Sequence, residues 1–182
     1  MNHIYENIHG WFTFPSFYSE IVKQSKDGYH IIEVGVWKGK SAAYMAVEII
    51  NSGKRIRFDC VDTWDGSIEC KDESLMKVKD GLYNCFLDNI KPVHQAINIV
   101  RMSSYDAAKT YNENSVNYIF IDASHDYDNV CADIKAWLPK VRCGGILAGH
   151  DFKHPPVRKA LQDVLNDKVI STHEDIWIYH KR

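Results

Sequence analysis

The sequence lacks the features that would mark a membrane or secreted protein. Its 182 residues contain no apolar run of about 18 residues, the length that a membrane-spanning helix requires. The first residues, MNHIYENIHGWFTF, do not have the basic and then apolar order of a signal peptide. We therefore expect a cytoplasmic protein without a membrane partner.

The cysteines and basic residues do not indicate a disulfide-rich, zinc-binding or nucleic-acid-binding protein either. The five cysteines are an odd number and no two have CxxC spacing, so neither a disulfide framework nor a zinc site is indicated. Lys and Arg are scattered and the formal net charge is -2, which argues against binding to nucleic acid. We expect a small-molecule partner, and a homo-oligomer is compatible with the sequence.

Apolar segments of strand length alternate with segments of helical period. A hydrophobic fraction of 45% suits one ordinary core, so residues 1–182 are predicted to form a single domain. The alternation is typical of an α/β fold with a doubly wound, mostly parallel sheet. The predicted strands are residues 29–35, 55–62, 96–102, 116–122 and 144–150.

Helical spacing and a final pair of short strands complete the predicted fold. Apolar residues recur at i, i+3, i+4 and i+7 in residues 42–50, 130–138 and 157–165, after the first, fourth and fifth strands. The segment KVISTHEDIWIYHKR is predicted to form two strands joined at residues 173–175, and a hairpin can only be antiparallel. The sheet should therefore carry an antiparallel C-terminal edge.

Two segments interrupt this alternation. Residues 65–92 begin polar and end helical, and connections of this length are often functional, so we expect an insertion loop and helix beside the substrate. Residues 1–28 are expected to form a helical and aromatic cap. Within it, Trp11 and Phe12 either cover the ligand as a lid or belong to the core.

A glycine turn follows the first predicted strand in EVGVWKGKS. Gly35 and Gly39 flank it, and Ser41 is placed as the N-cap of the next helix. The turn is not the dinucleotide fingerprint GxGxxG, which would need glycine at Trp37 and Lys40. Either a ligand approaches the glycine backbone near the free helix amides, or the glycines only allow the chain to turn.

Polar residues also follow the second and third predicted strands. Asp62 of CVDTWDGS is placed to accept hydrogen bonds from the hydroxyls of a ribose, the layout of a nucleoside site, or else to cap a turn. Ser103 and Ser104 of MSSYDAA either hydrogen-bond an adenine edge or cap the next helix.

Charged residues stand at the ends of the fourth and fifth predicted strands. Asp122 and His125 lie in IFIDASHDY, and His150 and Asp151 lie in GHDF. Charged groups at the end of a buried strand cost free energy unless they are paired or functional. Asp122 and His125 are therefore expected to have a function or partners that satisfy their charges.

Three stretches together resemble class I S-adenosylmethionine-dependent methyltransferases: EVGVWKGKSAAYMA, CVDTWDGS and IFIDASHDYDNVCADIKAWLPKVRCGGILAGHDF. More narrowly, they resemble the branch of the macrocin and mycinamicin sugar O-methyltransferases and the cephalosporin-hydroxylase-like proteins. The resemblance spans roughly residues 10–160. It implies a seven-stranded sheet with a reversed last strand, and methyl transfer from S-adenosylmethionine to a hydroxyl of a small molecule, a sugar or glycoside.

The resemblance also implies which residues bind the cofactor. S-adenosylmethionine would cross the C-terminal ends of the first, second and fourth strands. Its amino-acid end would lie at the glycine turn, its ribose at Asp62 and its adenine near Ser103. The implied contacts are Glu33, Gly35, Gly39, Ser41, Asp62, Ser103 and Asp122.

In the sugar methyltransferases, a divalent metal is held by an aspartate after the fourth strand and an acidic pair after the fifth, and a histidine acts as base. Mapped by motif, the aspartate is Asp122, the base is His125, and the pair falls at His150 and Asp151. A hydroxyl is a poor nucleophile at neutral pH, so methylation requires removal of its proton or stabilisation of its alkoxide. An imidazole serves the first purpose and Mg²⁺ or Mn²⁺ the second.

His150 departs from this pattern, because imidazole is a mediocre ligand for Mg²⁺. Either a softer ion such as Mn²⁺ or Fe²⁺ binds, or Asp151 ligates while His150 orients the substrate, or His125 works without a metal. His150 satisfied by backbone groups is a further alternative. For His125 the alternative is hydrogen bonding at the start of the next helix, where Ser124 and Asp126 compete as caps.

Two other functions stay open. A nicotinamide-dependent reductase is disfavoured by the broken GxGxxG and by the absence of a well-placed Tyr-x-x-x-Lys pair. A catalytically degenerate protein that binds S-adenosylmethionine or a nucleoside is compatible with the His150 departure and the short chain.

Overall fold

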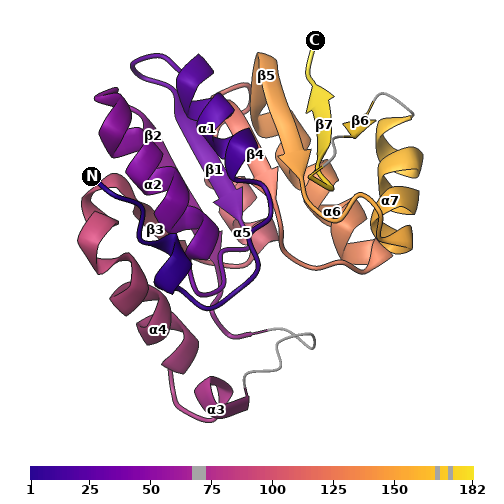
Figure 1. Cartoon of the computed structure of the whole chain (residues 1–182). Coiled ribbons are helices and arrows are strands. Elements are labelled where there is room, and N and C mark those ends of the chain that lie inside the picture. Colours follow the sequence, from indigo (N-terminus) through magenta and orange to yellow (C-terminus); the bar gives the residue numbers. More distant parts are fainter. Residues whose placement is uncertain (67–72, 167–168, 172–173) are drawn as a thin grey trace.

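A computed structural model describes residues 1–66, 73–166, 169–171 and 174–182 (Figure 1). Within them, seven strands form one sheet in the order β3-β2-β1-β4-β5-β7-β6. The strands are β1 His30–Val34, β2 Arg57–Asp62, β3 Asn98–Arg101, β4 Val116–Ile121, β5 Val141–Gly149, β6 Ile170–Ser171 and β7 Trp177–His180.

The direction of the strands confirms the predicted fold class. The pairs β1–β2, β1–β4, β2–β3 and β4–β5 are parallel, whereas β7 is antiparallel to both β5 and β6. The C-terminal strand is thus reversed, as expected, although part of the predicted turn at residues 173–175 lies outside the described residues. β5 begins earlier than predicted, at Val141, because a register irregularity opposite Val116 and Tyr118 lets pairing resume on both sides of it.

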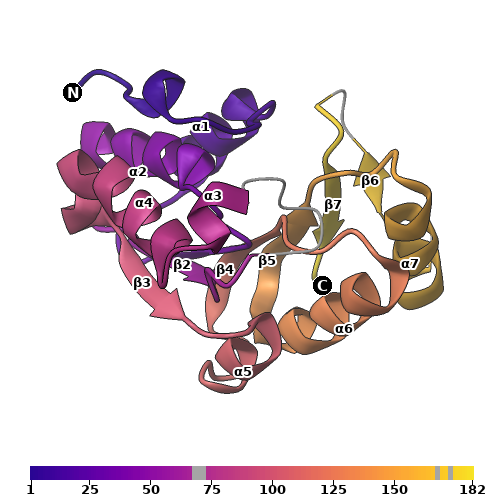
Figure 2. The same cartoon turned by 90° about the horizontal axis from the view of Figure 1, so that it is seen from below.

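Helices cover both faces of the sheet, which gives three layers. Figure 2 shows α1, α2 and α4 on one face and α5, α6 and α7 on the other. No helix in the described ranges is long and apolar enough to cross a membrane. The α-helices are α1 Pro15–Gln24, α2 Lys40–Ser52, α3 Glu73–Met76, α4 Gly81–Ile90, α5 Ser104–Lys109, α6 Tyr127–Trp137 and α7 Pro155–Leu165, and the 3-10 helices are Tyr5–Asn7, Lys91–Ala96 and Leu138–Lys140.

Alternating side chains of the central strands form two hydrophobic cores. Ile31 of β1 belongs to the core under α1 and α2, whereas Ile32 and Val34 belong to the core under α6 and α7. The two-residue period of a strand requires this alternation, so Glu33 must point to the same side as Ile31. That places a carboxyl group inside an apolar layer.

The start of α2 corrects one prediction, since Ser41 is not its N-cap. Gly39 occupies the cap with a left-handed φ of +82°, and the helix begins at Lys40. A Cβ at Gly39 would lie 2.8 Å from Cδ2 of Phe86, so the tight approach of α4 also requires glycine here. Ser41 therefore lies inside the first turn, where its hydroxyl donates a hydrogen bond to Glu33.

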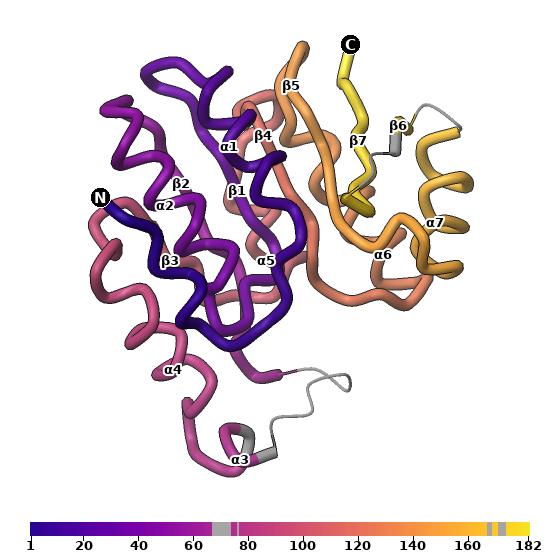
Figure 3. Tube along the Cα trace, in the orientation of Figure 1, coloured from indigo at the N-terminus to yellow at the C-terminus, as the bar shows by residue number. Residues whose placement is uncertain are grey.

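The N-terminal residues 8–14, which we call the strap, cross the carboxyl end of β1 before α1 begins. Figure 3 traces this path beneath β1 and up to α1. Phe14 is buried and packs against Tyr18 and Phe120, and Phe12 is partly buried beside Phe14. The strap is thus fixed to the core at its C-terminal end.

Candidate functional site

A cavity of about 650 Å³ opens where β1, β2, β4 and β5 end. This edge, next to the point where the strand order reverses between β1 and β4, is where doubly wound sheets bind ligands. One wall is the strap and the opposite walls are the loops that follow the strands. The described residues that line it are His9, Trp11, Phe12, Thr13, Phe14, Gly35, Val36, Trp37, Lys40, Ser41, Asp62, Gly66, Leu82, Asp122, Ala123, Ser124, His125, His150 and Asp151.

Gly35 brings the ends of β1 and β4 into contact. The amide of Asp122 donates to Val34 O at 2.8 Å, and the amide of Gly35, with a φ of +86°, donates to Val61 O at 2.9 Å. A Cβ on Gly35 would lie 2.2 Å from the carbonyl oxygen of Asp122. Only glycine permits this approach, and it sets the position of the Asp122 backbone at the cavity.

Asp62 joins the glycine turn after β1 to the loop after β2. Its Oδ2 accepts hydrogen bonds from the amides of Val36 and Trp37, each at 2.8 Å, and its Oδ1 accepts one from the amide of Trp64 at 2.8 Å. Asp62 therefore caps a turn in the structure, which was the alternative to ribose binding. Because a carboxylate has about four acceptor positions, one is left for a ligand, and the ribose contact stays a prediction.

Two tryptophans in these loops have backbone conformations that bulky residues rarely adopt. The φ angles of Trp37 and Trp64 are 49° and 55°. The indole Nε1 of Trp64 donates to Trp37 O at 2.8 Å, which links the two loops a second time. Such strain costs roughly 1 kcal/mol or more per residue and persists only where the surroundings enforce it. The hydrogen bonds between the two loops are what hold these backbone conformations in place.

Glu33 lies behind this turn rather than in the cavity. It is buried, and among the described residues it contacts the cavity wall through Ser41. Burial raises the pKa of Glu33 to about 8, a smaller opposing effect comes from the Ser41 hydrogen bond, and the charge of Asp122 raises the pKa further. Glu33 is thus largely neutral at pH 7, and its contact with the cofactor stays a prediction.

We expect Glu33→Gln to remove a pH-dependent loss of stability. Because the folded-state pKa of Glu33 is raised from 4.5 to about 8, the carboxyl group favours the folded state less and less as pH rises through that window. The wild-type free energy of unfolding should therefore fall by about 3–5 kcal/mol more than that of the variant between pH 5 and pH 8.5. Urea denaturation at the two pH values measures the difference.

A second buried carboxyl group provides the control for this experiment. Burial raises the pKa of Asp133 to about 6, so Asp133→Asn should alter the pH dependence only below that value. An identical decline above pH 6 in wild type and Glu33→Gln would show that Glu33 is already ionised in the folded protein.

Four titratable side chains that line the cavity meet where β4 and β5 end. His125 Nε2 lies 2.9 Å from Asp151 Oδ2 and 4.0 Å from Asp122 Oδ1, and His150 Nδ1 lies 3.1 Å from Asp151 Oδ2 and 3.9 Å from Asp122 Oδ1. The motifs after β4 and β5 thus come together, as the family resemblance implied. We call these residues, Asp122, His125, His150 and Asp151, the His–Asp cluster.

Asp151 lies between the two histidines, hydrogen-bonded to His150 Nδ1 and in a close ion-pair contact with His125 Nε2. Burial raises the pKa of Asp151, but the polar contacts with His125 and His150 and the charges of their imidazoles outweigh burial and hold the pKa well below its usual range. Asp151 also has a left-handed φ of 59°, which turns the chain sharply after β5. The carboxylate is therefore ionised and fixed between two imidazoles.

His150 joins the cluster to the strap. Its Nε2 is hydrogen-bonded to Thr13 Oγ1 at 3.0 Å, and its ring lies 5.0 Å from that of Phe14. Side chains rather than backbone groups satisfy this histidine, which corrects that alternative. Burial lowers the pKa of His150, but the hydrogen bond to Asp151 and the charges of Asp122 and Asp151 raise it above its usual value.

His125 is not needed to start the next helix. Asp126 is the N-cap of α6 and accepts a hydrogen bond from the amide of Asn129 at 3.0 Å, while Ser124 donates to Asp126 at 2.5 Å. The capping interpretation thus applies to Asp126, and the ring of His125 turns to Asp151 instead.

Three members of the cluster have ligand atoms close enough to share a metal ion. Within the described part of the chain, donor atoms of Asp122, His125 and Asp151 all lie within 4.8 Å of one another. Two carboxylates and an imidazole suit Mn²⁺ or Fe²⁺ at least as well as Mg²⁺. The group contains His125 rather than the predicted ligand His150.

Ser103 caps a helix and is not among the residues that line the cavity. It is the N-cap of α5, accepting from the amide of Asp106 at 3.1 Å. The capping interpretation therefore accounts for its position, and its predicted place near adenine has no support from the lining residues. Conversely, the lining residues His9, Thr13 and Lys40 were not predicted, because only the path of the strap brings His9 and Thr13 to the sheet edge.

Comparisons with known proteins agree with this geometry. Residues 32–152, more than half of the chain, match the family described as a methyltransferase domain. No curated protein matches the chain. Among solved structures, the O-methyltransferase NovP superposes with a TM-score of 0.69 at 16% identity, covering 93% of this chain and 79% of NovP.

Two further solved structures share the fold. The S-adenosylmethionine-dependent O-methyltransferase of Thermotoga maritima has a TM-score of 0.61 at 16% identity. The superposition covers 90% of this chain and 52% of the Thermotoga maritima protein. Aeropyrum pernix fibrillarin, which contains natively bound S-adenosylmethionine, has a TM-score of 0.56 at 12% identity, with 90% of this chain and 72% of fibrillarin covered. The family match and this fold lead to one conclusion: the chain belongs to the methyltransferase-domain family and is a class I S-adenosylmethionine-dependent methyltransferase.

Proposed function

We propose that the protein transfers a methyl group from S-adenosylmethionine to a hydroxyl of a small molecule, with His125 as the general base. The observation that carries this proposal is that the glycine turn after β1 and the His–Asp cluster line the same cavity. A donor placed against Gly35 and Ser41 would have its methyl group near an imidazole that is already held by a carboxylate. S-adenosylhomocysteine would be the product.

The chemistry requires a place for one proton. As the oxygen–methyl bond forms and the sulfur–methyl bond breaks, the hydroxyl proton must leave the oxygen. His125 can accept it, because the imidazolium so formed would lie 2.9 Å from Asp151 and 4.0 Å from Asp122. Two carboxylates stabilise that cation more than one would. Asp122 and Asp151 thus support the base electrostatically.

The same side chains could hold a divalent ion, since their donor atoms meet the distance requirement. Asp122 and Asp151 would be its carboxylate ligands, with His125 or His150 completing the set. The ion would supply stabilisation of negative charge on the acceptor oxygen. In an arrangement without the ion, His125 alone would remove the proton.

The acceptor is proposed to be a sugar or glycoside, which rests on the resemblance of the motifs to the sugar O-methyltransferases. Residues 1–28 and 65–92 are proposed to shape its pocket, although residues 67–72 of the second segment lie outside the described residues. Two lining residues of the cavity, Gly66 and Leu82, and the strap support this arrangement, because they border the same space as the cluster.

Asp122→Asn tests the proposed function. We expect it to lower the rate of methyl transfer by about 10²-fold or more, because it removes a charge that stabilises the protonated base and a ligand of the divalent ion. The assay follows S-adenosylhomocysteine formation with a panel of hydroxylated acceptors, with Mn²⁺, with Mg²⁺ and with a chelator. If wild type stays at background with every acceptor and metal, the catalytic proposal fails and the degenerate-protein alternative gains.

Cofactor choice is tested separately by thermal shift. S-adenosylhomocysteine should raise the melting temperature, whereas NADH should leave it unchanged, because Trp37 and Lys40 occupy two of the glycine positions of the dinucleotide fingerprint. Stabilisation by NADH alone would support the reductase alternative instead.

A further inference from the structure

Trp11 of the strap is an exposed indole at the edge of the cavity. Its relative exposure is 80%, although its ring stacks on that of Trp37 at a centroid distance of 5.6 Å and an interplanar angle of 17°. One face of Trp11 is therefore covered by Trp37 and the other is free. Leaving so much aromatic surface in water forfeits hydrophobic stabilisation, which a ligand or partner would recover.

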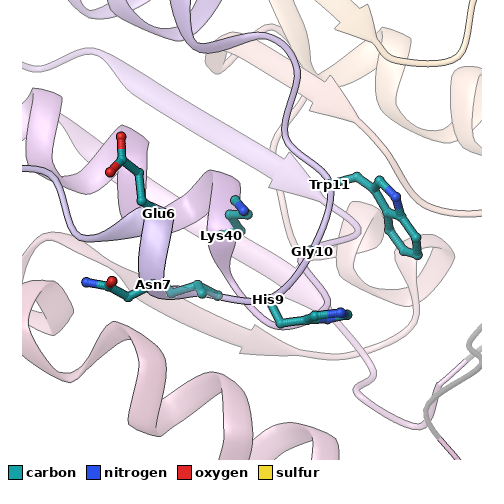
Figure 4. Close-up of a pocket in the computed structure, with 7 residues that line it drawn as sticks. Glu6, Asn7, His9, Gly10, Trp11 and Lys40 are labelled. Atoms are coloured by element: carbon teal, nitrogen blue, oxygen red, sulfur yellow. The ribbon is translucent and has the colours of Figure 1, made fainter.

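Trp11 does not belong to the core, because most of its side chain is exposed, and it lines two cavities. A second cavity of about 410 Å³ lies beside Glu6, Asn7 and Ile8 (Figure 4). It shares His9, Trp11 and Lys40 with the main cavity. Figure 4 shows the Trp11 ring projecting from the backbone away from Glu6 and Asn7.

Trp37, the support beneath Trp11, is fixed from several directions. Its amide donates to Asp62 and its carbonyl oxygen accepts from Trp64. Gly10 lets the strap approach the ring, since a Cβ there would lie 2.9 Å from Cζ3 of Trp37.

The indole N–H group of Trp37 also bears on the role of its ring. Its buried Nε1 has no hydrogen-bond partner in the described part of the chain. A buried donor without a partner costs free energy. The position of the Trp37 ring is therefore explained by contacts of its aromatic face, and not by a hydrogen bond from its N–H group.

We propose that the stacked Trp11–Trp37 pair is the acceptor platform, and that the acceptor carries its hydroxyl on a ring with a flat apolar face. The inference rests on the proposed function, because Trp11 lines the same cavity as His125 and Asp122. A ring lying against the free face of Trp11 recovers the hydrophobic area and gains a stacking contact. Both the C–H face of a pyranoside and the π face of a phenol provide this chemistry, whereas an acyclic polyol does not.

The test measures binding directly, without turnover. The full-length protein, saturated with S-adenosylhomocysteine, is titrated with phenyl β-D-glucopyranoside, methyl β-D-glucopyranoside, catechol and xylitol, and affinity is followed by ligand-observed NMR. Wild type should prefer at least one of the three cyclic probes to xylitol. Trp11→Ala should weaken that probe by about 10-fold, and Trp11→Phe should restore most of the affinity.

The two glucosides and catechol distinguish the sources of the ring. A preference for both glucosides over catechol identifies a pyranoside face, and the reverse identifies an aromatic acceptor. Tyr105→Ala is the matched control, because Tyr105 is 61% exposed on α5 but does not line the cavity. It should change neither affinity nor preference.

Several results would overturn the platform. Equal binding of xylitol and the cyclic probes, or unchanged binding in Trp11→Ala, would do so. Loss of a dimer in sedimentation without loss of probe binding would assign Trp11 to a contact between copies instead. Trp11-dependent binding without any methyl transfer would leave the platform intact and refute the proposed function, so the two failures are distinguishable.

Discussion

Replacing His125 with alanine is expected to lower kcat for methyl transfer by about 10²- to 10⁴-fold while leaving the affinity for S-adenosylhomocysteine nearly unchanged. The imidazole lies 2.9 Å from Asp151 and 4.0 Å from Asp122, whereas the cofactor is proposed to bind at the glycine turn after β1. Removing it takes away the proton acceptor but leaves Gly35 and Asp62 in place. Single-turnover kinetics and calorimetric titration with S-adenosylhomocysteine measure the two quantities.

Two further measurements sharpen this prediction. The affinity for Mn²⁺ separates two roles of His125, general base and metal ligand. If His125 is only the base, His125→Ala should bind Mn²⁺ nearly as well as wild type. If His125 is a ligand, the variant should bind Mn²⁺ more weakly. His154→Ala is the matched control, since its ring lies 6.0 Å from that of His125 and outside the cavity lining. If His125→Ala instead abolishes binding of S-adenosylhomocysteine, its assignment as base is wrong.

Gly35→Ala is expected to be the most damaging single-methyl change in the site. The added Cβ would lie 2.2 Å from the carbonyl oxygen of Asp122, and the residue would have to keep a φ of +86°. The ends of β1 and β4 must therefore separate, at a cost of roughly 3–5 kcal/mol. Chemical denaturation should show this loss, and S-adenosylhomocysteine binding should disappear because the turn and Asp122 move together.

The same substitution at another left-handed glycine separates strain from contact. Gly53, at the end of α2, has a φ of +66°, and a Cβ added there would meet no atom of the described residues within 4 Å. Gly53→Ala should therefore cost only about 1 kcal/mol and leave the cofactor affinity unchanged. Equal effects of the two substitutions would mean that the contact between Gly35 and Asp122 is unimportant.

The sequence predicts the fold well because local patterns determine it. Alternating apolar strands and amphipathic helices specify a parallel sheet, and the short segment ending in WIYH could pair only as a reversed strand. The predicted start of α2 was wrong because two signals competed. Ser41 is a good cap in isolation, but Gly39 turns the chain earlier under contact with Phe86.

The site is predictable only where its residues follow strand ends. Asp122 and Asp151 meet because β4 and β5 are neighbours. The bond between Thr13 and His150 joins residues 137 positions apart, and nothing local to either residue indicates it. The stacking of Trp11 on Trp37 likewise depends on the path of the strap.

A crystal structure of the protein soaked with S-adenosylhomocysteine and Mn²⁺ tests the proposed site most directly. We predict that the cofactor product lies across the carboxyl ends of β1, β2 and β4, with its sulfur facing His125 and anomalous density for the ion between Asp122 and Asp151. Absence of the ion with correctly placed S-adenosylhomocysteine would leave His125 as the sole agent of deprotonation. Density for S-adenosylhomocysteine outside this cavity, or with its sulfur turned away from His125, would contradict the proposal.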